Sequence, residues 1–272
     1  MDLSIIIVSY NAKRHLHDCL TSLQRHPPAL SYEIVVVDNA SADGSADVAA
    51  GFGGVQVIRS ERNVGFAAGN NIGIKASRGE HLLLLNNDTI VRSGTIDALV
   101  ARMRREPDVG VIGPRLVDGA GRAELSFGPT LTLLNEWRQG RLVRGLADND
   151  PEIVREVETI TRQEQRPDWV TGACLLVRRT DAEAVGLLDE RFFMYTEDVD
   201  FCASIRARGR QVLFMPSAEI VHLRGRSAAT AFAATRKAYE RSHLAFYRKH
   251  HPLYVPLVFV WRVLLHLLAS RT

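Results

Sequence analysis

The chain has 272 residues and a formal net charge of +3, with 46% apolar and 24% charged residues. This composition is typical of a globular protein that is long enough to bury a large core. Its three cysteines, Cys19, Cys174 and Cys202, form no Cys-x-x-Cys pair. No disulfide framework or zinc site follows from this spacing, and a reducing compartment is the simpler expectation. The first residues show no basic region followed by a long apolar stretch, so we expect no export signal.

The charge is unevenly distributed along the chain. Residues 223–272 contain nine Lys and Arg side chains and a single acid, Glu240, whereas residues 1–222 carry a net charge of −5. A basic tail on an acidic-to-neutral body indicates that the tail meets an anionic surface. Nucleic acid and anionic lipid are the two candidates for that surface.

Roughly the first 115 residues alternate short apolar runs with helical patterns, which is the signature of a parallel sheet covered on both faces. The predicted strands cover residues 4–8, 33–37, 55–58 and 81–85. The predicted helices cover residues 13–24, 45–50, 67–77 and 95–105. The sequence therefore predicts an α/β fold with a mostly parallel central sheet.

The pattern loosens after residue 109. Residues 109–116 predict a strand interrupted at Gly113-Pro114, and residues 115–165 predict a mobile loop or an acceptor-binding insertion. Order returns with a strand-like run at 169–178 and a helix at 199–208 that is closed by Gly209. Residues 212–215 and 220–222 predict two further short strands.

The end of the chain differs in kind from the rest. Residues 228–249 predict a helix, and Pro252 precedes the almost wholly apolar run 253–268, which only Arg262 and His266 interrupt. This run is shorter than the about 20 residues that span a bilayer. One interpretation is a helix packed on the body or on another subunit. We favour a helix in the membrane interface, because apolar residues, basic flanks and Trp261 occur together.

The most informative motif begins with four consecutive leucines, residues 82–85, and continues as Asn86-Asn87-Asp88. The leucines predict a strand buried on both faces. In an open α/β sheet, ligands bind at the carboxyl ends of such strands. The Asp88 carboxylate is therefore a candidate ligand for a hard divalent cation that carries phosphates.

Polar residues also follow the first two predicted strands. The first ends in Ser9-Tyr10-Asn11, and the second continues into Asp38-Asn39. A tyrosine can stack on a base and an aspartate can accept hydrogen bonds from a base or a ribose. Residues 41–45 are more simply explained as a strand-to-helix turn.

A glycine-rich segment, residues 62–71, opens a predicted helix. Glycines let a backbone approach a diphosphate, and a helix N-terminus favours negative charge. The segment matches neither the Walker loop nor the Rossmann fingerprint. By itself it is a weak indication of phosphate binding.

The densest acidic cluster, residues 194–201, places Glu197 and Asp198 at a predicted helix start. These carboxylates can cap the helix, or one of them can act as a general base toward a hydroxyl nucleophile. His222 follows a predicted strand. It is either a structural histidine or a metal ligand that titrates near neutrality.

Taken in order, these motifs resemble the inverting glycosyltransferases of family 2, in the branch that contains rhamnosyltransferases. The resemblance covers nearly all of residues 4–228 and is carried by the motifs at residues 4–11, 37–41, 63–70, 86–88, 171–173, 197–200 and 222–225. It implies a GT-A fold of three α/β/α layers followed by C-terminal helices. Residues 1–228 would form the catalytic domain, and residues 229–272 a basic, apolar tail that can anchor at a membrane interface.

The resemblance also implies roles for individual residues. Asp88 matches the last acid of the family's Asp-x-Asp motif, and His222 matches a further metal ligand. Asn86 replaces the first acid of that motif, which lowers the negative charge available to bind Mg²⁺ or Mn²⁺. Asp198 matches the catalytic base, with Glu197 as the alternative base. Trp169 and Gly172 would border the acceptor. The nucleotide-sugar would contact Ser9, Tyr10, Asn11, Asp38, Asn39, Asn63, Gly65, Gly69, Asn70 and Asn87.

The implied reaction is a single displacement that moves a sugar to a hydroxyl of a surface glycan or of a polyprenyl-linked glycan. By branch resemblance the donor is dTDP-rhamnose, with UDP- and GDP-sugars as alternatives. We expect a cytoplasmic protein, peripheral on the inner face of the cell membrane. Nucleic-acid binding is not expected, because the motifs do not include the aromatic interleaving of a base-stacking platform.

Two other functions compete with glycosyl transfer. Asn86 supports a non-catalytic membrane adaptor with a degenerate body. Such an adaptor would not need to keep Asp88, Asp198 and His222 together. A nucleotidyltransferase would need a glycine-rich, basic loop directly after the first strand. Residues 11–14 contain no glycine.

Overall fold

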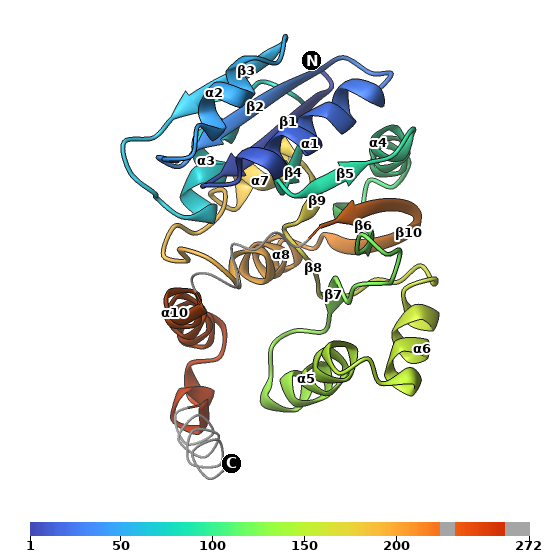
Figure 1. Cartoon of the computed structure of the whole chain (residues 1–272). Helices are drawn as coiled ribbons and strands as arrows, with labels where there is room; N and C mark the ends of the chain where they lie inside the picture. Colours follow the sequence, from blue (N-terminus) through green and yellow to red (C-terminus); the bar gives the residue numbers. More distant parts are fainter. Residues whose placement is uncertain (224–231, 259–272) are drawn as a thin grey trace.

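An eight-stranded sheet forms the centre of the computed structural model, which describes residues 1–223 and 232–258 (Figure 1). The strand order is β3-β2-β1-β4-β9-β6-β10-β5. The strands of this sheet are β1 (Leu3–Ser9), β2 (Tyr32–Asp38), β3 (Val55–Arg59), β4 (His81–Leu85), β5 (Thr89–Val91), β6 (Val109–Val117), β9 (Cys174–Arg178) and β10 (Gln211–His222). A second, two-stranded sheet pairs β7 (Phe127–Gly128) with β8 (Trp169–Val170).

Six strands of the large sheet run in the same direction. β1, β2, β3 and β4 pair in parallel, and so do β6 and β10. β9 runs antiparallel between β4 and β6, and β5 runs antiparallel to β10 at the edge. The carboxyl ends of the six strands therefore share one edge of the sheet, where β5 and β9 begin. The predicted α/β fold with a mostly parallel sheet is confirmed.

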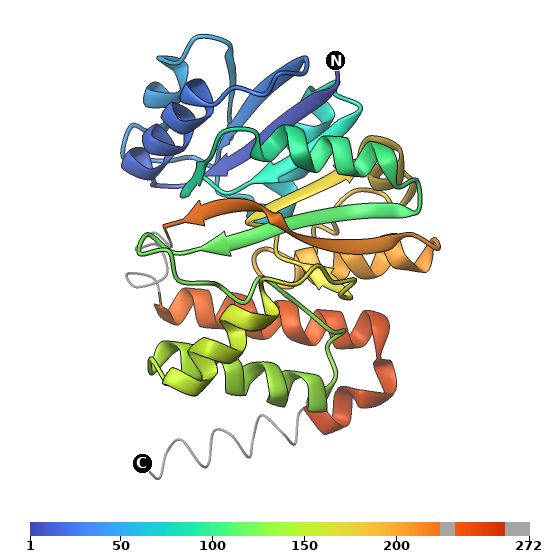
Figure 2. The ribbon, with the colours of Figure 1, turned by 90° about the vertical axis from the view of Figure 1, so that its right-hand side faces the viewer.

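Helices cover both faces of the sheet (Figures 1 and 2). Side chains of α1 (Lys13–Arg25), α2 (Ser45–Ala50) and α4 (Thr95–Arg105) pack in the cluster on one face. Side chains of α3 (Phe66–Ala76), α7 (Arg179–Ala184) and α8 (Glu197–Ala207) pack in the cluster on the other face. These two helical layers and the sheet make the three layers that the sequence predicts.

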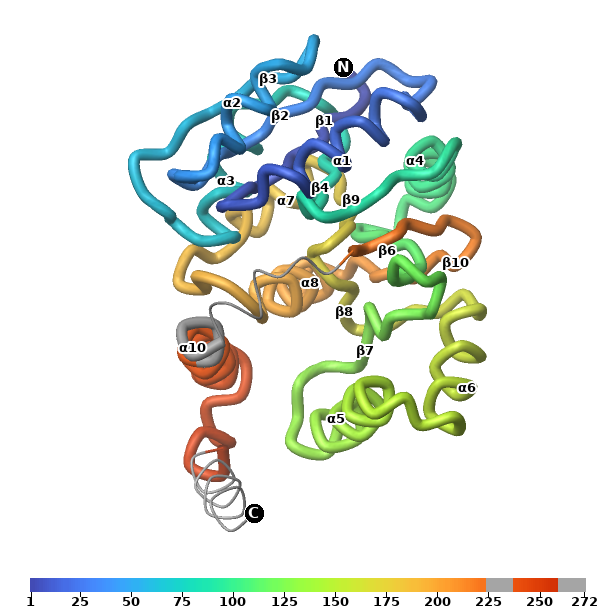
Figure 3. The backbone as a smooth tube through the Cα atoms, in the orientation of Figure 1, coloured from blue at the N-terminus to red at the C-terminus, as the bar shows by residue number. Residues whose placement is uncertain are grey.

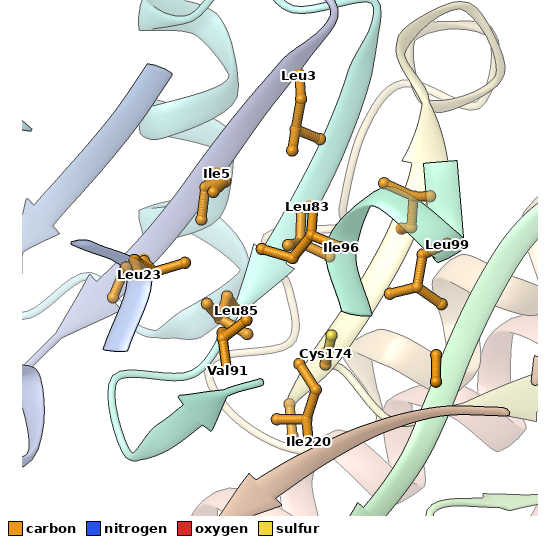
Figure 4. Packing of buried hydrophobic residues seen from close by; sticks show 14 of the residues in the cluster. Leu3, Ile5, Leu23, Leu83, Leu85, Val91, Ile96, Leu99, Cys174 and Ile220 are labelled. Atoms are coloured by element: carbon orange, nitrogen blue, oxygen red, sulfur yellow. The ribbon is translucent and has the colours of Figure 1, made fainter. Parts of the chain in front are cut away.

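The run of four leucines in β4 shows how the sheet joins the two clusters. Leu83 and Leu85 belong to the cluster with α1 and α4, whereas Leu82 and Leu84 belong to the cluster with α3 and α8. Figure 4 shows Leu83 and Leu85 among Leu3, Ile5, Ile96 and Leu99. Successive side chains of a strand point to opposite faces, so a strand buried on both faces needs an unbroken apolar run.

Two predicted strand interruptions are wrong. β6 continues through Gly113-Pro114, and residues 211–222 form one strand with a register shift between Met215 and Glu219. β6 tolerates Pro114 because its pairing with β9 involves only Val111 and Ile112. Although Pro114 has no N–H, no hydrogen bond between β6 and β9 is therefore lost.

The loop predicted for residues 115–165 is also wrong, because this region contains α5 (Leu133–Ala147) and α6 (Pro151–Ile160). Thr132 caps α5 by accepting a hydrogen bond from the Asn135 N–H at 3.3 Å. Asp150 caps α6, and Pro151 occupies its first turn. α5 was missed because no residue of this helix is buried, so its sequence gives no signal of a helix that faces the core.

The strand-like run 169–178 is in fact two strands. Thr171, Gly172 and Ala173 separate β8 from β9, and the two strands belong to different sheets. The helix predicted at 199–208 begins two residues earlier, at Glu197, so the acidic cluster lies inside its first turn.

After the gap at residues 224–231, α10 (Phe232–His250) and the 3-10 turn η1 (Pro252–Tyr254) follow (Figure 3). Phe246, Tyr247 and Val258 pack against Phe192 and Val199 of the body in a third apolar cluster. Among residues 1–223 and 232–258, no helix is long and apolar enough to cross a membrane. The start of the predicted helix and most of the apolar run 253–268 lie outside the described residues.

Ion pairs reinforce this packing of α10 on the body. Asp200 of α8 contacts Lys249 at 2.9 Å and His250 at 2.6 Å. Glu136 of α5 contacts His243 at 2.7 Å and accepts a hydrogen bond from the Tyr247 hydroxyl. The described part of the tail therefore packs on the body, whereas the two interpretations of the run 253–268 concern residues that lie mostly outside the described ones.

Candidate active site

The turn after β4 is held at the carboxyl edge of the sheet by backbone hydrogen bonds. The Asn86 N–H donates to the Ala173 carbonyl at 2.9 Å, and the Thr89 hydroxyl donates to the Asn86 carbonyl at 2.8 Å. The Asn87 side-chain amide donates to the Val8 carbonyl at 3.2 Å and to the Ser9 hydroxyl at 3.4 Å. These bonds join the ends of β1 and β4 to the start of β9, and they fix where Asp88 stands.

Asp88 and His222, both partly buried, and the buried Glu124 form a chain of titratable groups on this edge. His222 Nε2 lies 3.3 Å from the Asp88 carboxylate, and Nδ1 lies 3.0 Å from Glu124 Oε2. Burial by itself would lower the pKa of His222, but hydrogen bonds to the two carboxylates outweigh it and raise that pKa to about 9. The two candidate metal ligands, far apart in the sequence, are thus brought together.

The donor atoms at this point suit Mg²⁺ or Mn²⁺, which accept carboxylate oxygen and imidazole nitrogen. Because Glu124 contacts Nδ1, the other nitrogen of His222 faces Asp88. The Asn86 amide nitrogen lies 3.5 Å from the same Nε2. Within the described ranges no cluster of three or more His, Cys, Asp or Glu residues could hold a metal.

The ends of β1 and β2 are tied together beside this pair. The Asn11 N–H donates to the Ser41 hydroxyl at 2.9 Å, and the Asn11 side chain accepts from the Ala42 N–H at 2.8 Å. Asp38 is buried, and one of its carboxylate oxygens accepts from the Ser41 N–H at 3.0 Å. Its other oxygen is buried without a hydrogen-bond partner in the described structure. Tyr10 stands exposed at the same rim.

The glycine-rich segment 63–71 closes on residue 193 of the loop before α8. The Phe66 N–H donates to the Phe193 carbonyl at 2.7 Å. Gly65 has φ 88°, and a Cβ placed on it would lie 2.3 Å from the Phe193 oxygen, so only glycine fits there. A Cβ on Gly69 would lie 2.9 Å from a methyl group of Val8.

Three asparagines stabilise this segment. The Asn63 side chain accepts from the Gly65 N–H, the Asn39 amide donates to the Gly65 carbonyl, and the Asn70 amide donates to the Phe66 carbonyl. The side-chain oxygens of Asn39 and Asn70 are buried and have no partner in the described part of the chain. The amide nitrogens of Asn39 and Asn70 thus bind the backbone, while their side-chain oxygens can accept a hydrogen bond from another donor.

Asp198 is held by backbone amides at the start of α8. Its carboxylate accepts from the Gly172 N–H at 2.9 Å and from the Val199 N–H at 2.8 Å. Burial raises the pKa of Asp198, and these two bonds and the Thr171 hydroxyl partly offset the increase. Glu197 is buried, and burial together with the charge of Asp198 raises its pKa well above the ordinary value. The Gly172 and Val199 amides thus stabilise the charged form of Asp198.

Of the two candidate acceptor residues, Gly172 lies at Asp198. A Cβ on Gly172 would lie 3.1 Å from the Phe66 ring and 3.5 Å from Asp198 Cβ. Trp169 is partly buried, and its indole N–H donates to the Pro129 carbonyl at 2.8 Å. Trp169 therefore supports the segment that leads to Gly172.

Sequence reasoning missed Glu124, Thr171 as a partner of Asp198, and Phe193. Glu124 lies in the stretch that was expected to be a loop, and no motif marks it. The Phe193 carbonyl acts through the backbone, so its residue type gives no signal. Thr171 belongs to a motif that was recognised, but its contact with Asp198 depends on the separation of β8 from β9.

Sequence comparison assigns this α/β protein to the glycosyltransferases. The sequence model of Glycosyl transferase family 2 matches residues 4–159, and the chain is a member of that family. It is 28% identical over 262 residues to the N-acetylglucosaminyl-diphospho-decaprenol L-rhamnosyltransferase of Mycobacterium tuberculosis. That alignment covers 92% of this chain and 85% of the relative.

Solved structures share the fold. The mannosyltransferase PcManGT from Pyrobaculum calidifontis, in complex with GDP-Man and Mn²⁺, superposes with a TM-score of 0.66 at 16% identity. The match covers 94% of this chain and 68% of that one. A fragment of S. aureus TarS superposes with a TM-score of 0.58 at 18% identity, covering 88% of this chain and 64% of that one. These likenesses confirm the predicted GT-A type of fold.

Proposed function

We propose that this protein is an inverting, metal-dependent glycosyltransferase that moves rhamnose from dTDP-rhamnose to a hydroxyl of a lipid-linked glycan. The observation that carries the proposal is the position of Asp198. Its carboxylate is held by the Gly172 and Val199 amides at the start of β9 and α8. That is the same edge of the sheet at which β4 delivers Asp88 and β10 delivers His222.

In this mechanism Asp198 acts as the general base. It takes the proton of the acceptor hydroxyl, and the oxygen attacks the anomeric carbon from the face opposite the nucleotide. The bond between that carbon and the diphosphate oxygen breaks, and the nucleoside diphosphate leaves with the electron pair. Attack from the opposite face inverts the anomeric configuration. Glu197 is not assigned this role, because burial and the charge of Asp198 raise its pKa well above the ordinary value.

Asp88 and His222 would hold a divalent cation, and Glu124 would orient His222 toward it. When bound, such an ion stabilises the charge that develops on the leaving diphosphate. PcManGT and GalNAc-T7 were both solved with Mn²⁺, which supports a divalent cation here. With Asn86 in place of an acid, the donor's own phosphates would complete the coordination.

The unpaired oxygens at the ends of β2 and α3 support a donor-binding role. Asp38, Asn39 and Asn70 each keep a buried side-chain oxygen without a partner in the described residues. Burying such an atom is costly unless a ligand supplies the hydrogen bond. We assign Asp38 to the base or ribose, Tyr10 to stacking, and Ser9, Asn11 and Asn87 to the border of the donor.

The sugar and the acceptor are proposed from the Mycobacterium relative, whose name specifies L-rhamnosyl transfer and a decaprenyl-diphosphate-linked acceptor. GDP- and UDP-sugars are the alternative donors, since GDP-Man and UDP-GlcNAc are bound in structures of the same fold. Trp169 and Gly172 would border the acceptor beside Asp198.

We assign residues 1–228 to the catalytic domain and residues 229–272 to a tail that brings it to the inner face of the cell membrane. The net positive charge of the tail and the apolar run that begins at Leu253 support this location. The experiment is a donor screen that follows nucleoside diphosphate release with and without Mn²⁺. Consumption of dTDP-rhamnose only with the cation and an acceptor is expected, and release from none of the donors would overturn the proposal.

A further inference from the structure

α5 contributes no buried side chain to any cluster of the core. Its inner side is occupied by specific contacts. Glu136 bonds His243 and Tyr247 of α10, the Gln139 amide donates to the Phe127 carbonyl at 2.9 Å, and Leu133 packs against the third apolar cluster. The opposite side of the helix is exposed along most of its length, and only near its end does Gly145 lie against Ile153 of α6.

The outer side carries one stripe of exposed residues, which we call the α5 stripe: Leu134, Trp137, Arg138, Arg141 and Arg144. Residues three and four positions apart share a face of a helix, and each member of the stripe is three or four positions from another. Leu134 is 56% exposed and Trp137 is 53% exposed. A large apolar surface and three guanidinium groups thus lie on the same face.

The charges of the α5 stripe are incompletely balanced. Arg141 pairs with Glu156 of α6 at 2.8 Å. Arg138 and Arg144 have no ion pair within residues 1–223 and 232–258. A surface that complements the stripe must therefore supply negative charge beside an apolar layer. Lipid headgroups above acyl chains supply both, and Trp and Arg are the residues that favour this boundary.

The position of α5 agrees with such a partner. Figures 1 and 2 show α5 and the turn after α10 at the same end of the molecule, away from β3. Leu253, in that turn, is 89% exposed, and the neighbouring Leu257 is 52% exposed. The apolar run proposed as the membrane tail continues from this point.

We propose that the α5 stripe is a docking surface for an anionic lipid bilayer. This inference extends the membrane association proposed above and gives the catalytic domain its own lipid contact. Trp137 and Leu134 enter the headgroup region, and Arg138 and Arg144 bind lipid phosphates. With α5 and the tail both attached, the body is held in one orientation on the membrane.

Other occupants of the α5 stripe fit less well. Residues 259–272 contain Arg262 and Arg271 and no acidic residue, so they cannot neutralise Arg138 and Arg144. A second copy of the chain, docked through the same face, would bring like charges together, because a two-fold interface apposes identical patches. Both alternatives are tested below.

The first test measures binding of the full chain to vesicles of phosphatidylcholine with and without phosphatidylglycerol. One arginine near an anionic surface contributes about fivefold to the partition coefficient, so Arg138→Gln/Arg144→Gln should weaken binding about 30-fold. The matched control is Arg105→Gln/Arg208→Gln, which removes two exposed arginines that lie at the ends of α4 and α8. We expect this control to bind like the unaltered protein apart from a small effect of net charge.

The second test reports the contact itself. In Trp169→Phe/Trp261→Phe, Trp137 is the sole tryptophan, and brominated anionic lipids should quench its fluorescence. In Trp137→Phe/Trp261→Phe, the partly buried Trp169 remains, and it should not be quenched. The comparison separates lipid contact at α5 from attachment through the tail.

Equal vesicle binding of the two arginine variants would overturn the proposal, as would an unquenched Trp137. A dimer that Arg138→Gln/Arg144→Gln dissociates, with vesicle binding unchanged, would assign the stripe to a second copy. If Trp137 is quenched by the lipids but the protein consumes no nucleotide-sugar, the lipid contact of α5 stands and the proposed transfer reaction is rejected.

Discussion

Glu124 Oε2 lies 3.0 Å from Nδ1 of His222, on a chain segment 98 residues away. The contact directs the other ring nitrogen toward the Asp88 carboxylate, 3.3 Å away. Carboxylates that orient a ligand histidine in this way strongly affect metal affinity. Glu124 is therefore a positioning residue for the proposed cation.

We expect Glu124→Ala to weaken Mn²⁺ binding about 10- to 100-fold in the presence of a nucleoside diphosphate. Glu124→Gln should lose less, because its amide oxygen can still accept a hydrogen bond from Nδ1. Electron paramagnetic resonance of free Mn²⁺ measures this binding without turnover. The same Mn²⁺ affinity in Glu124→Ala and in the unaltered protein would contradict the positioning role.

Asp198→Asn should lower the rate of sugar transfer about 10²- to 10⁴-fold, since that is the typical contribution of a general base. Donor binding, measured by calorimetry, should change little because Asp198 acts on the acceptor. Glu197→Gln is the matched variant, next to Asp198 in the sequence, and it should retain most of the activity. The reverse pattern, with Glu197→Gln inactive and Asp198→Asn active, would exchange the two roles.

The raised pKa of Glu197 predicts a pH effect on stability. Burial holds the proton in the folded state above pH 4.5, where the unfolded chain releases it. The folded state then binds more protons, so the stability contributed by this group is present below pH 4.5 and is lost as the pH rises toward the folded pKa. Glu197→Gln removes this loss, and its melting temperature relative to the unaltered protein should rise with pH. If the difference in melting temperature between the two proteins stayed constant over the roughly three pH units from 5 to 8, the raised pKa of Glu197 would be contradicted.

Gly65→Ala should destabilise the fold and weaken donor binding. The backbone at Gly65 has φ 88° and ψ −179°, a region essentially restricted to glycine, and the added methyl group would meet the Phe193 carbonyl. Strain and overpacking together should cost about 2–4 kcal/mol. Gly53→Ala is the control, because a Cβ there meets nothing within 4 Å. Chemical denaturation measures both variants, and equal stabilities would show that the segment adjusts at little cost.

The sheet and its ligand edge could be predicted because they depend on local patterns. The leucines of β4 encode burial on both faces, and the polar residues after β1, β2 and β4 follow from the direction of the strands. Convergence of Asp88 with His222 needed the family resemblance, because β4 and β10 are distant in sequence and are not adjacent in the sheet.

Other features could not be read from the sequence. α5 has no buried residue, so its sequence gives no signal of a helix that faces the core, and only the cap at Thr132 marks its start. Glu124 is one carboxylate in an irregular stretch, and its importance appears only when β10 brings His222 to it. The strand β6 continues through Gly113-Pro114 because β9 stops pairing before it, which is a property of the neighbouring strand.

The anomeric configuration of the transferred sugar tests the central claim most directly. The full chain would be incubated with dTDP-rhamnose, Mn²⁺ and a soluble acceptor, and the new glycosidic linkage would be read by nuclear magnetic resonance. A single displacement assisted by Asp198 predicts a product with the anomeric configuration opposite to that of the donor. A product that retains the donor's configuration would contradict the mechanism.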